Sequence, residues 1–195
     1  MQILCFPEAD TPATLRAQVL DLQHQAWPPA EPSPGPDADA VLSHDPALHP
    51  HSMLLVDDGT VVAALDVLSK PLVHAGRRYR AGGLSTVVTR PAVRGRGYGR
   101  RLVAAARTAM ADAGLDLGVF TCDRPLEPFY RSAGWRLLPG THLIGGTPRC
   151  PLASDRPPFD KVTMADFFSA GARRHHAAFR HARLALYPGT IDRLW

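Results

Sequence analysis

A glycine-rich turn, Arg94-Gly95-Arg96-Gly97-Tyr98-Gly99, lies between a predicted strand and a predicted amphipathic helix. Glycines let a backbone approach a ligand closely, and the start of a helix presents unpaired N–H groups at the positive end of its dipole. The turn lacks the Gly-Lys-Ser/Thr of a Walker A loop, and its glycines do not follow the G-x-G-x-x-G spacing of a dinucleotide fingerprint. It therefore predicts a phosphate or pyrophosphate site of another kind, at a point where a strand leads directly into a helix.

The hydrophobic periodicity around this turn predicts a mixed α/β (α+β) fold with a mixed sheet. Helices are predicted over residues 11–24, 39–44, 99–113, 126–133 and 163–176, and strands over 53–56, 61–68, 77–80, 84–89, 117–121, 135–138 and 182–187. Thr11 is the predicted N-cap of the first helix, and Gly114 the glycine that ends the third. The proline-rich residues 28–37 are interpreted as a surface loop. With 195 residues and no internal repeat, the chain is expected to form a single domain over 1–195.

Composition and cysteine usage exclude several classes of protein. No apolar run approaches the 18 residues needed to cross a bilayer, so a membrane span is not expected, and the N-terminus does not resemble a signal peptide. Cys5, Cys122 and Cys150 are far apart in the chain and contain no CxxC pair, which argues against a disulfide framework and against a cysteine-built metal site. We expect a cytoplasmic protein that needs no metal ion.

The positive charge of the chain is concentrated around the glycine-rich turn. No acidic residue occurs between Asp66 and Asp112, and this interval holds one lysine and nine arginines, a local charge of +10. Such a field attracts an anion, either nucleic acid or a phosphorylated small molecule. The alternative is a set of arginines on solvated faces with no ligand.

Two motifs resemble those of the GNAT superfamily of acyl-CoA-dependent N-acyltransferases. Arg94, Gly97 and Gly99 fill its signature of Arg or Gln, two residues, Gly, one residue, Gly or Ala. The segment Phe129-Tyr130-Arg131-Ser132-Ala133-Gly134-Trp135 resembles its Y-x-x-x-G-F element. The resemblance covers about residues 50–140, with residues 84–89 in the place of the central bulged strand.

The resemblance implies acetyl-CoA as co-substrate and a set of residues that bind it. The predicted cofactor-binding residues are Val87, Val88, Thr89, Arg94, Gly95, Arg96, Gly97, Tyr98, Gly99 and Arg100. Tyr130 would protonate the leaving thiolate as the general acid. The alternative for Tyr130 is an aromatic side chain of the core.

The general base is not evident from the sequence. Members of the family often carry a glutamate on the central strand, whereas the polar residues here are Ser85 and Thr86. Ser85 and Asp66 are predicted to border the acceptor, and Asp66 is one candidate base. Glu127, Asp192 and the terminal carboxylate are the others. Asp66 could equally face solvent from a half-exposed strand.

The last nine residues resemble the ending of aminoglycoside 2′-N-acetyltransferases, and their Gly-x-Ile-Asp element resembles the nodulation N-acyltransferases. The resemblance implies that Asp192 and Trp195 border the acceptor amine and act in catalysis. Residues 141–195 are then an elaborated C-terminal segment that shapes the acceptor site. The kasugamycin-inactivating branch of such enzymes is a further possibility, and a terminal tryptophan that only caps the core is the alternative.

The sequence therefore predicts an enzyme that acetylates a primary amine of a small cationic acceptor, of the aminoglycoside type. The expected partners are acetyl-CoA and this small-molecule amine, without nucleic acid or membrane, and a homodimer is a possible assembly. The alternatives are acetylation of another small amine or of a protein or peptide amine, and a non-catalytic acyl-CoA-binding sensor. A nucleic-acid-binding module is disfavoured because no recognition motif accompanies the arginines.

Overall fold

The structure, a computed structural model, describes residues 1–28, 43–157 and 159–186. The strands are β1 (Gln2–Pro7), β2 (His51–Asp57), β3 (Thr60–His74), β4 (Arg77–Thr89), β5 (Leu117–Asp123), β6 (Arg136–Leu137), β7 (His142–Gly146), β8 (Pro151–Ala153), β9 (Lys161–Phe167) and β10 (Arg183–Ala185). The α-helices are α1 (Ala13–Ala26), α2 (Tyr98–Asp112), α3 (Glu127–Ser132) and α4 (Ala170–Arg174). Short 3-10 helices are η1 (Glu8–Asp10), η3 (Pro46–Leu48), η4 (Pro91–Val93), η5 (Arg124–Leu126) and η6 (His176–Phe179).

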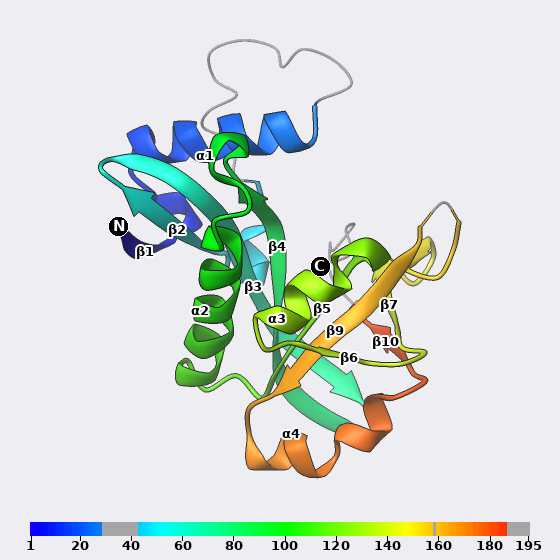
Figure 1. Ribbon diagram of the computed structural model, residues 1–195. Coiled ribbons are helices and arrows are strands. Elements are labelled where there is room, and N and C mark those ends of the chain that lie inside the picture. Colours follow the sequence, from blue (N-terminus) through cyan, green and yellow to red (C-terminus); the bar gives the residue numbers. More distant parts are fainter. Residues whose placement is uncertain (29–42, 158, 187–195) are drawn as a thin grey trace.

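Seven strands form a mixed sheet in the order β1-β2-β3-β4-β5-β9-β6 (Figure 1). Neighbouring strands are antiparallel except β4 and β5, which are parallel. A second sheet has the order β10-β7-β8. The mixed α/β fold predicted from the sequence is confirmed, including the hairpin at Asp57–Gly59 and the helix that follows the glycine-rich turn.

The helices cover opposite faces of the seven-stranded sheet. Met53 and Leu55 of β2 belong to the cluster under α2, whereas Leu54 and Val56 belong to the cluster under α1. Because successive strand side chains point to opposite faces, α1 and α2 lie on different sides of the sheet. None of the helices in the described ranges has the length and apolar character that a bilayer crossing requires.

A third apolar cluster joins the two sheets. Leu68 and Leu117 of the large sheet pack in one cluster with Leu143 of β7, Leu184 of β10 and Phe179 of η6. This cluster lies on the face that α1 also covers, since Ala81 of β4 and Ala64 of β3 both point to that side. The C-terminal elements and α1 therefore share one face of the sheet.

Residues 161–176 differ from the predicted helix. Strand β9 occupies Lys161–Phe167, buried on both faces between β5 and β6, and it is followed only by the five α-helical residues of α4 and the 3-10 helix η6. A short apolar run that is buried on both sides has no period that separates strand from helix, which explains the wrong prediction. The Ser169 hydroxyl accepts a hydrogen bond from the Ala172 amide and starts α4.

Other differences concern element boundaries. Thr11 is not the N-cap of α1, because Pro12 occupies that position and no side chain caps the helix. The two strands predicted over 77–80 and 84–89 are one strand, β4, whereas β1, β7 and β8 were not predicted. The short helix predicted over 39–44 falls largely outside the described residues.

Candidate active site

The glycine-rich turn adopts a backbone that favours glycine. Gly95 and Gly97 both have φ of 79°, and Gly97 occupies the N-cap position of α2. Gly99 is required for a different reason: a Cβ there would lie 2.6 Å from Thr89 Oγ1 and 3.4 Å from the Phe129 ring. The amides of the first helical turn have no acceptor within the helix. The turn therefore packs closely on β4 and α3 and leaves these amides available to an anion.

Strands β4 and β5 separate beside this turn. They pair only at Ala81–Leu117 and Gly82–Gly118, although β4 continues to Thr89 and β5 to Asp123. The edge of β4 beyond Gly82 consequently has no strand pairing on the β5 side. Its N–H and C=O groups can hydrogen-bond a ligand inserted between the strands.

The gap and the turn belong to one pocket of about 650 Å³. Its lining includes Val87, Val88, Thr89, Arg94, Gly95, Arg96, Gly97, Tyr98, Gly99, Arg100 and Tyr130. Every predicted cofactor-binding residue is thus in one place, together with the predicted general acid. Phe129 of α3 completes the apolar side of the pocket.

Tyr130 lies deep in this pocket, with 6% of its surface exposed. Its ring packs edge-on against Phe120 and Phe129, each with a centroid separation of 4.9 Å. Burial raises the pKa of Tyr130, and the nearby Cys122 and Asp123 raise it further. The phenol therefore stays protonated and is a proton donor rather than an acceptor.

A row of polar side chains crosses the other face of the sheet, which α1 and the C-terminal elements share. Ser52, Asp66 and Ser85 are register partners on β2, β3 and β4. The Ser52 hydroxyl donates to Asp66 Oδ1 at 2.6 Å, and the Thr86 hydroxyl donates to Asp66 Oδ2 at 2.5 Å. Thr86 reaches Asp66 because the pairing of β3 and β4 is irregular there and Thr86 has φ of 50°.

Asp66 is buried by this arrangement, with 3% of its surface exposed. Burial raises its pKa, although His44 and the two hydroxyl groups act in the opposite direction. The alternative of a solvent-facing Asp66 is therefore wrong. Its carboxyl is enclosed by protein groups, so contact with a bulky acceptor would have to pass through a neighbour.

His44 is the neighbour that lies next to Asp66, and no sequence motif marks it as a site residue. Its Nε2 lies 3.0 Å from Ser85 Oγ. Its Nδ1 lies 3.4 Å from Glu8 Oε2 and 3.9 Å from Asp66 Oδ2. His44 lies between α1 and η3, at the end of the short helix predicted over 39–44, and only the folded structure brings it to the central strand.

Glu8 is the second carboxyl beside His44. Burial alone would raise its pKa, but contacts with His44 and the Ser43 amide and the charges of His44 and Arg16 lower it below the usual value. Glu8 therefore remains ionised while Asp66 resists ionisation, because polar contacts outweigh burial at Glu8 whereas burial outweighs them at Asp66. No group of three His, Cys, Asp or Glu side chains in the described ranges is arranged to hold a metal ion.

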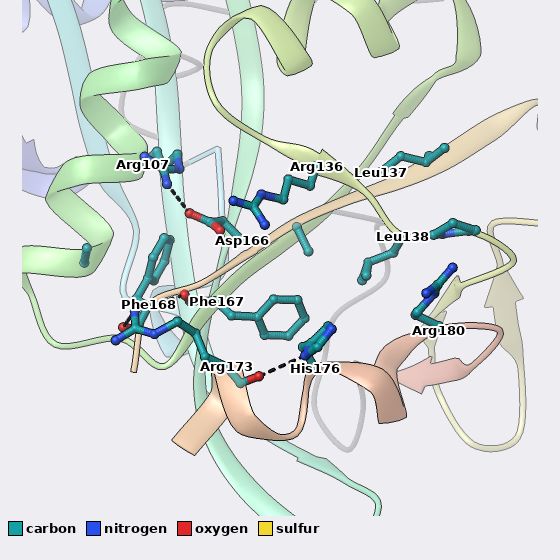
Figure 2. A pocket seen from close by; sticks show the side chains of 13 residues that line it. Arg107, Arg136, Leu137, Leu138, Asp166, Phe167, Phe168, Arg173, His176 and Arg180 are labelled. Carbon is teal, nitrogen blue, oxygen red and sulfur yellow. Dashed lines mark hydrogen bonds and ion pairs between the residues drawn. The ribbon is translucent and has the colours of Figure 1, made fainter. Parts of the chain in front are cut away.

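Two predicted site residues, Asp192 and Trp195, lie outside the described residues. The predicted acceptor residues Ser85 and Asp66 are brought together with His44 on the α1 face, whereas Tyr130 lies on the side of the central strand that α3 covers. The central strand, β4, thus has the candidate base Asp66 on one side and the candidate acid Tyr130 on the other. A further groove, far from both, lies between α2, β9 and η6 (Figure 2).

A family model described as "Acetyltransferase (GNAT) domain" matches residues 12–138. No curated protein matches the chain significantly. The match covers the strand, the glycine-rich turn and the helix that form the pocket, together with Tyr130.

Solved structures share the fold at low sequence identity. An acyl-CoA N-acyltransferase from Pseudomonas aeruginosa is 20% identical, with a TM-score of 0.55 over 84% of this chain and 97% of that one. ElaA from Escherichia coli is 14% identical, with a TM-score of 0.56 over 85% and 99%. An aminoglycoside 6′-N-acetyltransferase complexed with coenzyme A is 14% identical, with a TM-score of 0.59 over 87% and 98%.

Proposed function

The chain belongs to the GNAT acetyltransferase family, and we propose on that basis that it transfers the acetyl group of acetyl-CoA to a primary amine of a small cationic acceptor. One observation supports this proposal most strongly. The glycine-rich turn, the unpaired edge of β4 and Tyr130 all lie at one pocket. The pocket fits the co-substrate: amides and arginines suit its pyrophosphate, and an unpaired strand edge suits an extended amide-containing arm.

The reaction requires two proton transfers around one substitution. The neutral amine attacks the thioester carbonyl, a C–N bond forms, the C–S bond breaks, the amine loses a proton and the thiolate gains one. Tyr130 would supply the proton to sulfur, because its raised pKa keeps the phenol protonated. The amide product and free CoA would then leave.

His44 would take the proton from the acceptor. The His44 side chain is 5% exposed and its Nε2 contacts the partly exposed Ser85 on the central strand, so the Ser85 hydroxyl could relay a proton from the acceptor ammonium to Nε2. The ionised Glu8, 3.4 Å from Nδ1, would stabilise the imidazolium that forms. A base oriented and charge-balanced by a carboxylate is a recurrent catalytic arrangement. Asp66 would position the hydroxyl groups of Ser52 and Thr86 and support this pair.

The acceptor is proposed to be of the aminoglycoside type, with acetylation at a 2′-amino group, and the kasugamycin class is an alternative acceptor of similar chemistry. Asp192 would attract a cationic acceptor and Trp195 would stack on its sugar ring. Residues 141–195 would shape this side of the site within a single domain spanning 1–195. The aminoglycoside 6′-N-acetyltransferase among the similar structures supports the fold and leaves the acceptor to experiment.

The test is release of CoA thiol with acetyl-CoA and a panel of aminoglycosides, kasugamycin, polyamines and peptides, followed by mass spectrometry of each product. We expect saturable acetylation of a small polyamine-like acceptor, and a raised KM for that acceptor in Asp192→Asn with the KM for acetyl-CoA unchanged. Acetylation of peptides alone would move the assignment to protein or peptide amines. Tight binding of acetyl-CoA without transfer to any amine would favour a sensor.

A further inference from the structure

A second arginine-lined groove is separate from the acetyl-CoA pocket. It has a volume of about 710 Å³ and lies between the C-terminal half of α2, β6 with the turn after it, the end of β9, and the α4–η6 segment (Figure 2). No residue lines both this groove and the pocket at the glycine-rich turn. Its volume falls in the usual range for small-ligand sites.

The groove has an excess of positive charge. Four arginines line it, from four different segments: Arg107, Arg136, Arg173 and Arg180. Asp166 is the one acidic residue among its described lining residues, and Arg107 is already paired with it. Arg136 and Arg180 are exposed and take part in no ion pair among the described residues. The three arginines other than Arg107 have no ion-pair partner among the described residues, and like charges gathered in this way oppose folding, so their placement favours a ligand that neutralises them.

Several of these basic groups are held in place by the fold. The Arg173 guanidinium donates to the carbonyls of Phe168 and Phe167, which leaves its remaining N–H groups for other acceptors. His176 contacts the Arg173 carbonyl through Nδ1, at 2.9 Å, and this leaves Nε2 free (Figure 2). Arg107 is fixed by Asp166, and its Nε is buried without a hydrogen bond in the described structure. A ligand would therefore meet a partly preorganised set of donors.

The groove is also lined by apolar and aromatic surface. Leu137, Leu138, Phe167 and Phe168 contribute to its walls, and the Phe167 ring lies 6.1 Å from the His176 ring. Arginine forks bind phosphate oxygens in pairs, while aromatic rings and guanidinium planes stack on flat rings. We propose that this groove is a second ligand site, which binds a phosphorylated organic anion of the size of a nucleoside monophosphate.

A binding role and a purely structural role make opposite predictions for stability. If Arg136 and Arg180 serve a ligand, their removal relieves charge repulsion and leaves the free protein as stable as before, or more stable. If they hold the fold together, their removal lowers the melting temperature. The unliganded stability of the variant therefore separates the two roles.

The experiment titrates uridine 5′-monophosphate into protein already saturated with CoA, so that the glycine-rich turn is occupied. We expect saturable binding by calorimetry, at least tenfold weaker in Arg136→Ala/Arg180→Ala and unchanged in Arg77→Ala/Arg78→Ala, a control with the same charge change at two exposed positions of β4. The groove variant should melt at or above the wild-type temperature and retain its affinity for CoA.

Three results would overturn the proposal. The first is no saturable binding of uridine monophosphate to the CoA-loaded protein. The second is equal weakening in the groove variant and the β4 control, which would show a non-specific charge effect. The third is equal affinity for inorganic phosphate and for uridine monophosphate, which would show that the apolar walls contribute nothing. Uridine without phosphate should not bind.

Discussion

At the residue scale, the hydroxyl group of Tyr130 is expected to be needed for turnover but not for binding of acetyl-CoA. In Tyr130→Phe the ring keeps its edge-on contacts with Phe120 and Phe129, so acetyl-CoA affinity should stay nearly unchanged. The rate of transfer should fall by ~10²–10⁴-fold, the usual contribution of a general acid. Tyr79→Phe removes the hydroxyl of a buried tyrosine in the cluster that joins the two sheets and is the control, with an expected rate close to wild type. Equal rates in the two variants would remove the catalytic role of Tyr130.

His44 can be tested by a variant that keeps a hydrogen bond to Ser85 but cannot take up a proton. His44→Gln should lower kcat by about 10²-fold at neutral pH without changing the affinity for acetyl-CoA. The loss should shrink at alkaline pH, because more of the acceptor amine is then neutral before it binds. His24→Gln, on the exposed surface of α1, is the control. A defect that is the same at every pH would point to a structural role for His44.

Asp66 should impose a pH dependence on stability. Burial raises its pKa, so above pH 3.8, its ordinary value, the folded state holds a proton that the unfolded state has released. Its contribution to stability is therefore complete in acid and is lost as the pH rises through the raised pKa. The unfolding free energy of Asp66→Asn relative to wild type should rise as the pH increases above about 4. Parallel urea-denaturation curves across that range would contradict the buried, hard-to-ionise carboxyl.

At the scale of elements, the glycine-rich turn before α2 differs from the glycine turn between β3 and β4 because it lines a pocket. Gly97 has φ of 79° and Gly76, in the β3–β4 turn, has φ of 71°, with no atom within 4 Å of an added Cβ at Gly76. Alanine at either position should cost about 1–2 kcal/mol of stability through its strained backbone. Only Gly97→Ala should also weaken acetyl-CoA binding, measured by calorimetry. Equal affinity in both variants would exclude close contact between the turn and the pyrophosphate.

The elements that the sequence predicted correctly are those whose signals are local. The strand, turn and helix over 84–113 combine a periodic pattern, positive-φ glycines and a glycine that ends the helix, so neighbouring residues suffice to identify them. Strand β9 depends on burial between β5 and β6, and β1 depends on pairing with β2. These are long-range contacts, which local periodicity does not record. His44 was missed for the same reason, because residues far apart in the chain meet only in the folded sheet.

At the scale of the whole molecule, the C-terminal part of the chain is built into the sheet. The family match ends at residue 138, yet β9 lies between β5 and β6 in the seven-stranded sheet. The cluster that joins the two sheets contains residues from both sides of that limit. Part of the predicted segment 141–195 therefore pairs with β5, whose Phe120 packs against Tyr130, in addition to any role beside the acceptor.

Phe179 tests whether the two sheets unfold as one unit. Its side chain is fully buried and contacts the rings of His74 and Tyr79 from the large sheet, with centroids 4.7 and 5.2 Å away, and the Phe167 ring at 5.2 Å. Phe179→Ala should cost about 3–5 kcal/mol, because a cavity would replace these contacts. In a single domain, the whole calorimetric transition should move to lower temperature and remain one peak. Trp27→Ala removes an exposed aromatic side chain and should leave the transition in place. If Phe179→Ala split the transition and shifted only one part, residues 139–186 would form a separate folding unit, and a single domain over 1–195 would be excluded.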